Sequence, residues 1–169
     1  MNYKKCCFTG HRPKGLPWGY NELNENCIEF KKVIKNIIEK AIINGYTYFI
    51  TGMALGIDII CAELVLNLKE KYNNVVLECA IPCLNQEKKW TCVQQERYKK
   101  FLSNADIIHY VSNESYSNTC MNERNKYMVE QCDVVIAVWN GKPSGTRNTI
   151  EIAKSLGKKI RVIDPFNPK

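Results

Sequence analysis

Residues 46–58 read Tyr-Thr-Tyr-Phe-Ile-Thr-Gly-Met-Ala-Leu-Gly-Ile-Asp, and this stretch decides the fold class. Its first six residues are rich in β-branched and aromatic side chains, which predicts a strand. The glycines of residues 52–56 predict a turn, and the apolar period of residues 58–71 predicts a helix. The stretch is therefore typical of one strand–turn–helix unit of an α/β protein.

The same alternation extends outward in both directions along the chain. Strands are expected at 3–9, 46–51, 75–81, 106–111, 134–139 and 159–163, and helices at 27–43, 58–71, 86–103, 119–131 and 145–156. Strands that alternate with helices at this spacing form a parallel sheet covered on both faces. We therefore predict an α/β three-layer sandwich with a mostly parallel sheet flanked by helices.

Length and composition indicate one ordinary domain. The 169 residues suffice for a single core, so we expect one domain over residues 1–169. No apolar stretch approaches the roughly 20 residues of a membrane span, and the first residues lack the pattern of a signal peptide. These features predict a cytoplasmic protein with no membrane partner.

The cysteines and the net charge are less informative about function. Nine scattered cysteines, mostly within apolar segments, are expected to be reduced and buried, and they lack the spacing of a zinc site, so no metal is expected. The net charge of +7 favours anionic partners but does not distinguish a nucleotide from DNA. Each basic cluster has the alternative interpretation of a solvated helix face or strand end.

Three polar turns follow strands and carry the functional signal: residues 8–13, 50–58 and 141–149. In parallel sheets ligands bind beyond the carboxyl ends of the strands, where all three turns lie. Glycine permits close approach of backbone to a ligand, and a helix that begins beyond the turn offers N–H groups to a phosphate. We therefore expect one composite ligand site.

The first two turns offer side chains and backbone to that site. Thr9, Gly10, His11 and Arg12 follow the first strand, and the arginine fork suits a phosphate. The alternative is a surface loop whose charges face water. In the second turn, candidate ligand residues are Thr51, Gly52, Met53 and Gly56, although an ordinary tight turn explains this glycine spacing equally well. Asp58 is interpreted as a carboxylate that favours the helix dipole.

The third turn is the best phosphate candidate. Ser144, Gly145 and Thr146 lie where a helix begins and can donate backbone and hydroxyl hydrogen bonds together. The turn lacks the Gly-Lys-Ser/Thr ending of a Walker A loop, so magnesium-dependent ATP hydrolysis is not implied. On the helix at 119–131, Arg124 flanks the packed stripe and could reach the sheet edge; its alternative is a surface salt bridge. Trp139 could stack on a base or pack in the core.

Taken together, the three turns resemble the superfamily that joins DprA-type DNA-binding proteins with LOG-type cytokinin-activating phosphoribohydrolases, and most closely its YpsA-like branch. Residues 8–13 resemble the opening signature of that branch, and residues 141–149 resemble its phosphate loop. Residues 50–58 resemble its second signature and the Gly-Leu-Ala-Arg-Gly-Ile-Asp stretch of DprA. The resemblance covers nearly the whole chain. It implies a Rossmann-like fold, nucleotide-type ligands such as ADP-ribose or NAD fragments, and homo-oligomers.

The LOG enzymes combine Met-His-x-Arg-Lys-x-x-Met with Pro-Gly-Gly-x-Gly-Thr-x-x-Glu, whose arginine and final glutamate serve cleavage of an N-glycosidic bond. The resemblance assigns the arginine to Arg124, which is the catalytic candidate if this chain is an enzyme. Thr149 stands where the pattern has glutamate, and a hydroxyl cannot replace a carboxylate that stabilises an oxocarbenium-like sugar. Glu151 points elsewhere on the helix, so Glu63, Glu114 or Glu123 would have to substitute.

We therefore expect a sensor or binding module for a phosphorylated nucleotide-type ligand, with no required cofactor. One alternative is hydrolysis of nucleoside 5′-monophosphates, which predicts release of free base. The other is binding of single-stranded DNA, which predicts an affinity that falls steeply with salt.

Overall fold

Six strands form one sheet in the computed structural model, which describes residues 3–169. The strands are β1 (Lys4–Gly10), β2 (Tyr46–Thr51), β3 (Val76–Ile81), β4 (Ile107–Tyr110), β5 (Val134–Val138) and β6 (Lys159–Ile163). Their order across the sheet is β4-β3-β2-β1-β5-β6, and every neighbouring pair is parallel. The predicted parallel sheet is confirmed.

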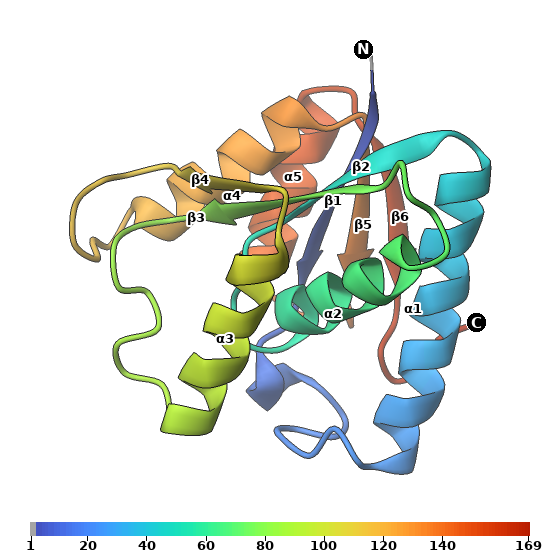
Figure 1. The fold of residues 1–169 in the computed structure, drawn as a ribbon, viewed down its shortest axis with the longest axis horizontal. Coiled ribbons are helices and arrows are strands. Elements are labelled where there is room, and N and C mark those ends of the chain that lie inside the picture. The colour runs from blue at the N-terminus through green and yellow to red at the C-terminus, as the bar shows by residue number, and fades with distance from the viewer. Residues whose placement is uncertain (1–2) are drawn as a thin grey trace.

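Helices cover both faces of this sheet, which gives a Rossmann-like three-layer fold. They are α1 (Glu25–Ile43), α2 (Ile57–Lys69), α3 (Cys92–Asn104), α4 (Cys120–Gln131) and α5 (Gly145–Ser155), with a short 3-10 helix, η1 (Pro13–Gly15). Figure 1 shows α1, α2 and α3 in front of the sheet and α4 and α5 behind it.

The alternation of side chains along β1 explains why two layers of helices are needed. Cys6 and Phe8 belong to the apolar cluster under α1, α2 and α3, whereas Cys7 belongs to the cluster under α4 and α5. Successive side chains of a strand point to opposite faces, so the buried apolar segment of β1, residues 6–8, must be covered on both faces. All nine cysteines are free thiols, and all but Cys92 are buried as small hydrophobes.

The path of the chain creates a switch point between β1 and β5. From β1 the chain moves outward through β2, β3 and β4, and then returns through α4 to β5 on the other side of β1. The ends of the two central strands are in register, with Gly10 beside Val138. Crossover segments leave this edge in opposite directions, which opens a crevice at the carboxyl ends of β1 and β5.

One predicted helix begins later in the structure than the sequence suggested. The helix expected over residues 86–103 begins at Cys92, and residues 85–89 form turns instead. The reason is a capping box: Thr91 Oγ1 accepts the Gln94 N–H at 3.3 Å, and Gln94 Oε1 accepts the Thr91 N–H at 3.0 Å. Within residues 3–169 no helix is both long and apolar enough to cross a bilayer.

Candidate functional site

A cavity of about 280 Å³ lies at the switch point. Eight of the twelve residues proposed as ligand-binding line it: Thr9, Gly10, His11, Arg12, Arg124, Ser144, Gly145 and Thr146. The other four, all from the second turn, are buried outside its lining: Thr51, Gly52, Met53 and Gly56. The first and third turns and α4 therefore converge on one cavity, and the second turn contributes Ala54 and Asp58 to its lining in place of the four residues predicted.

Arg124 forms the floor of the cavity from α4. Its side chain is only 3% exposed, and its Nη1 donates to the Gly52 carbonyl and, at 3.4 Å, to the Ala80 carbonyl. Its Nε donates to Asn125 Oδ1 at 2.9 Å. The guanidinium thus joins the carboxyl ends of β2 and β3, as expected of a residue that leans toward the sheet edge. Burial lowers the pKa of Arg124, and the negative charge of Asp58 opposes that shift.

The second turn is held by its own hydrogen bonds. Thr51 Oγ1 donates to the Asp58 carbonyl at 2.9 Å and accepts the Met53 N–H at 3.3 Å. Met53 has φ 56°, a left-handed conformation that a non-glycine residue adopts only when its surroundings impose it. Its side chain is fully buried, so packing fixes this conformation. The turn is a rigid support.

Three glycines allow close packing around the second turn: Gly10 and Gly56 where it meets the first turn, and Gly52 where it meets Arg124 of α4. A Cβ on Gly10 would lie 2.5 Å from Ile57, and a Cβ on Gly56 would overlap the His11 carbonyl oxygen. A Cβ on Gly52 would overlap the guanidinium of Arg124. Each of these glycines is therefore required by a contact within the protein itself.

The third turn differs because its glycines face open space. Among residues 3–169, no atom outside the adjoining residues and the backbone of α5 lies within 4 Å of a Cβ built on Gly141 or Gly145. Ser144 is the N-cap of α5, and its Oγ accepts the Arg147 N–H at 3.3 Å. The N–H groups of Gly145 and Thr146 belong to the first turn of the helix. Backbone N–H groups in that turn have no acceptor within the helix. This end of α5 offers donors and a positive dipole end to the cavity.

His11 and Arg12 complete the cavity from the first turn. His11 is buried, and its Nε2 accepts the backbone N–H of Asn140 at 3.1 Å, which ties the first turn to the loop after β5. Burial lowers the pKa of His11, while its hydrogen bond with Asn140 and the charge of Asp164 oppose the shift. Arg12 is exposed, and its Nη2 lies 3.8 Å from Met121 Sδ at the mouth of the cavity.

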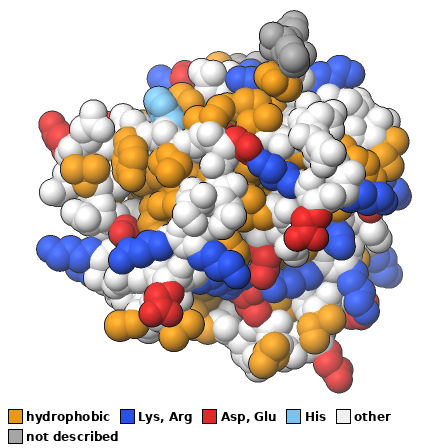
Figure 2. Space-filling model, in the orientation of Figure 1, with side chains coloured by type: hydrophobic (Ala, Val, Ile, Leu, Met, Phe, Trp, Pro, Cys, Tyr) orange, Lys and Arg blue, Asp and Glu red, His pale blue; other side chains and the backbone are white. Residues whose placement is uncertain are grey.

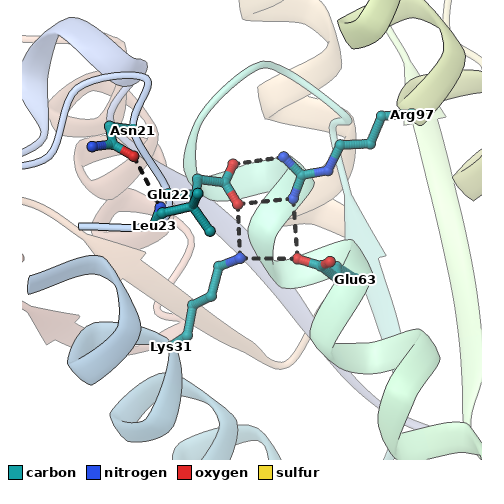
Figure 3. A network of polar contacts seen from close by, with 6 residues as sticks. All are labelled: Asn21, Glu22, Leu23, Lys31, Glu63 and Arg97. Atoms are coloured by element: carbon teal, nitrogen blue, oxygen red, sulfur yellow. Dashed lines mark hydrogen bonds and ion pairs between the residues drawn. The ribbon is translucent and has the colours of Figure 1, made fainter. Parts of the chain in front are cut away.

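An ion-pair network anchors the segment that follows Arg12 (Figure 3). Glu22 accepts hydrogen bonds from both terminal nitrogens of Arg97, at 2.6 and 3.0 Å, and pairs with Lys31 at 2.7 Å. Glu63 also pairs with Arg97 and Lys31, at 3.0 and 3.2 Å. Burial raises the pKa of Glu22, but the hydrogen bonds from Arg97 and Lys31 outweigh burial and lower the pKa below its ordinary value. Glu63 is committed to this network.

Asp58 was interpreted as a helix-dipole residue, but it also lines the cavity. Among residues 3–169 it is the one carboxylate in the lining, its Oδ2 accepts the Ala54 N–H at 3.4 Å, and Asp58 is 6% exposed. Burial raises the pKa of Asp58, while Arg124 and Arg12 act in the opposite direction. The sequence signal for a cavity-lining role was the position of Asp58 in the first turn of a helix that follows a strand. Only the packing of α2 against β1 shows that its carboxylate reaches the crevice.

The glutamate of the LOG pattern has no equivalent here. Thr149 is buried, and its Oγ1 donates to the Gly145 carbonyl of the same helix at 3.0 Å. Glu151 is exposed and pairs with Lys154 at 3.0 Å. Trp139 does not line the cavity; its Nε1 donates to the Lys142 carbonyl at 2.6 Å and holds the third turn.

The comparison with protein families decides where the chain belongs. The YpsA model, described as the YspA SLOG family, matches residues 6–165. The chain belongs to this SLOG family. One relative of this SLOG protein is the uncharacterized SPbeta prophage-derived protein YoqJ of Bacillus subtilis, which is 34% identical over 85% of this chain and 93% of its own length. A UPF0398 protein of Halalkalibacterium halodurans is 26% identical over 97% of this chain and 89% of its own length.

Two solved structures share the fold of this SLOG protein. DNA processing protein A of Helicobacter pylori, whose structure describes a single-stranded DNA binding mode, superposes with a TM-score of 0.63 over 96% of this chain and 69% of its own. DprA of Streptococcus pneumoniae gives 0.61 over 95% and 50%. Both are 18% identical to this chain, so the likeness shows the fold alone.

Proposed function

We propose that this SLOG protein binds a phosphorylated nucleotide-type ligand in the cavity at the carboxyl edge of its sheet. The observation that carries the proposal is the end of α5. Gly145 lies beside open space, and Gly145 and Thr146, at the start of α5, line a cavity that is also lined by Arg12 and Arg124. A phosphate there would accept hydrogen bonds from helix N–H groups and pair with a guanidinium fork.

The two arginines have different parts in this proposal. Arg124 already donates to backbone carbonyls and supplies a fixed positive charge beneath the ligand. Arg12 is exposed at the mouth and is free to close over a bound phosphate, since its contact with Met121 Sδ is weak. Binding therefore depends on Arg12 through direct contact with the phosphate and on Arg124 through the fixed charge beneath the cavity.

Binding of AMP and ADP-ribose, measured by isothermal titration calorimetry, tests the proposal, with adenosine as the unphosphorylated control. We expect the phosphorylated ligands to bind and adenosine to bind at least tenfold more weakly, because a charge-assisted hydrogen bond contributes about 1.5–3 kcal/mol. Arg12→Ala should reduce the affinity for AMP about tenfold. Arg161→Ala, which removes an exposed arginine on β6, is the matched control. Equal binding of AMP and adenosine would contradict the proposal.

A hydrolase is the second candidate, and Asp58 is the observation that favours it. A cavity-lining carboxylate whose pKa burial raises can serve as an acid or base at a sugar. This candidate predicts release of free base from nucleoside 5′-monophosphates, with loss of the activity on Asp58→Asn. Binding of these nucleotides without any release of base would leave the binding module as the function.

Binding of DNA is the third candidate, supported by the structural likeness to DprA. On the face drawn in Figure 2, basic and acidic side chains are intermixed, which gives no uniform basic track for a nucleic-acid backbone. This candidate predicts tight binding of single strands that is insensitive to Arg12→Ala. Cytoplasmic location and homo-oligomer formation stay predictions.

A further inference from the structure

The two edge strands of the sheet differ in the charge that they carry. β6, at one edge, carries Lys159 and Arg161, and charged side chains of this kind keep a strand edge from pairing with another chain. β4, at the opposite edge, reads Ile-Ile-His-Tyr over residues 107–110 and contains no lysine, arginine, carboxylate or proline. The β4 edge therefore lacks the residues that prevent pairing.

β4 exposes apolar side chains on both faces of the sheet. Ile108 and Tyr110 are paired with Cys79 and Ile81 of β3, which places them on the face covered by α1, α2 and α3, and each is 43% exposed. Ile107 lies on the other face and is 40% exposed. Figure 2 shows hydrophobic side chains gathered over the part of the molecule where Figure 1 labels β3 and β4. The helices that bury the central strands thus leave β4 accessible.

The backbone of β4 offers hydrogen-bonding groups along its outer side. Donors to a neighbouring strand alternate along a parallel strand, and the Asp106 N–H donates to the Leu77 carbonyl of β3 at 3.0 Å. The N–H and C=O groups of Ile107 and His109 therefore point away from β3. Within residues 3–169 no strand pairs with β4 on that side. An edge of this kind can accept one further strand.

A second copy of this chain suits this edge because of charge. Each copy carries a net charge of +7, so two copies repel each other wherever basic surfaces meet. This repulsion is smallest at β4, which has no ammonium or guanidinium group, and Asp106 before it is already paired with Lys69. An acidic partner would instead be attracted to the edge of β6, where Lys159 and Arg161 are exposed.

We infer that two copies of this chain pair through β4, antiparallel and around a two-fold axis that passes beside Ile108. In this register Ile107 of one copy lies opposite His109 of the partner subunit, and their outward N–H and C=O groups bond to each other. Ile108 lies opposite its own counterpart and forms an apolar cross-strand pair. Pairing occupies both β4 edges, so the assembly closes at two copies.

This inference is separate from the proposed function. The phosphate cavity lies at the carboxyl ends of β1 and β5, and β1 is three strands from β4 in the sheet. Ile108 lines neither that cavity nor the larger one beside it. We therefore expect Ile108→Lys to bind AMP as tightly as the wild type does.

Sedimentation velocity over a range of protein concentrations tests the inference. A short edge buries less area than a standard interface, so we expect a weak dimer with a dissociation constant on the order of 10 µM. Ile108→Lys places two ammonium groups opposite each other and should weaken the dimer by about tenfold or more. Val162→Lys, at a 51% exposed position on β6, is the matched control and should dimerise as the wild type does.

Hydrogen-exchange mass spectrometry of the wild type provides a measurement that needs no substitution. Peptides that span β4 should exchange more slowly at concentrations where the dimer forms, because the Ile107 and His109 amides become hydrogen-bonded. Peptides that span β6 should exchange at the same rate at every concentration. This result holds even if Ile108→Lys fails to fold, which circular dichroism would show.

Each other outcome decides against the dimer or against its location. A wild type that stays monomeric far above the expected dissociation constant would overturn the inference, as would assembly beyond two copies. A dimer that survives Ile108→Lys, or is lost in Val162→Lys, would place the interface elsewhere. A monomeric wild type whose β4 peptides are protected only in cell extract would assign the edge to a strand of another protein. Loss of AMP binding by the wild type would contradict the proposed function alone.

Discussion

The turns at residues 50–58 and 141–149 both follow a strand and lead into a helix, but their glycines serve different purposes. In the earlier turn a side chain on Gly52 would overlap Arg124, and one on Gly56 would overlap the His11 carbonyl. In the later turn the space beside Gly145, which lines the cavity, is open, whereas Gly141 lies outside the lining and has φ 84°, which favours glycine. A glycine that faces its own protein permits packing, whereas one that faces a cavity leaves room for a ligand. The later turn is therefore the better place for a phosphate.

The largest effect on stability is expected from adding a side chain to a glycine of the turn at residues 50–58. Gly52→Ala should lower the free energy of unfolding by about 3 kcal/mol. The new methyl group would displace the Arg124 guanidinium from its carbonyl acceptors and leave a buried charge without partners. Urea denaturation measures this change. The backbone of Gly52 has no positive φ, so the cost comes from the contact alone. In an Arg124→Ala background the same substitution should therefore cost little, and simple additivity of the two changes would contradict this account.

The matching change in the turn at residues 141–149 should weaken ligand binding without affecting the fold. Gly145→Ala places a methyl group that meets no described atom within 4 Å beyond the adjoining residues and the backbone of α5, so the free energy of unfolding should change by less than about 0.5 kcal/mol. The methyl group would occupy space proposed for the phosphate, and the AMP affinity should fall about tenfold. Calorimetry on the folded variant checks this, and an unchanged affinity would place the phosphate elsewhere.

A smaller loss of stability is expected from removing the N-cap of α5, Ser144. Ser144→Ala removes the acceptor of the Arg147 N–H and should lower the free energy of unfolding by about 1 kcal/mol. Ser155→Ala, near the other end of α5, is the control, because its hydroxyl donates to the Ile152 carbonyl and caps no N–H group. Thermal denaturation of both variants measures the difference, and equal losses would show that the cap is unimportant.

The smallest effect concerns His11, which accepts the Asn140 N–H and so connects the first turn to the loop after β5. Burial lowers the pKa of His11 below 6.5, so below pH 6.5 the unfolded chain takes up a proton that the folded chain resists. This contribution to stability is complete above pH 6.5 and is lost as the pH falls toward the folded pKa. Unfolding free energies between pH 7.5 and 5.5 should decline with acidity in the wild type. The decline should be shallower in His11→Gln, and parallel curves would contradict the assignment.

Much of the fold could be predicted because its signals are local. The strands and helices follow apolar periods within ten to twenty residues, and their alternation implies a parallel sheet. The start of α3 was predicted too early, because Trp90, before Thr91, also fits the helical spacing of Val93 and Phe101, and the capping box that begins the helix depends on side-chain hydrogen bonds. The position of Arg124 was expected from its place on the helix. Its two carbonyl acceptors were not, since Gly52 and Ala80 lie on other elements.

The sequence by itself determined the α/β alternation, the presence of turns at the carboxyl edge, and the absence of glutamate at position 149. Each of these is a property of neighbouring residues. Only the tertiary structure decided which glycines face the protein and which face a cavity, and that Asp58 borders the cavity at this edge. The physical reason is that open space and unpaired hydrogen-bonding groups are defined by segments far apart in the chain, and these meet only when the sheet is assembled.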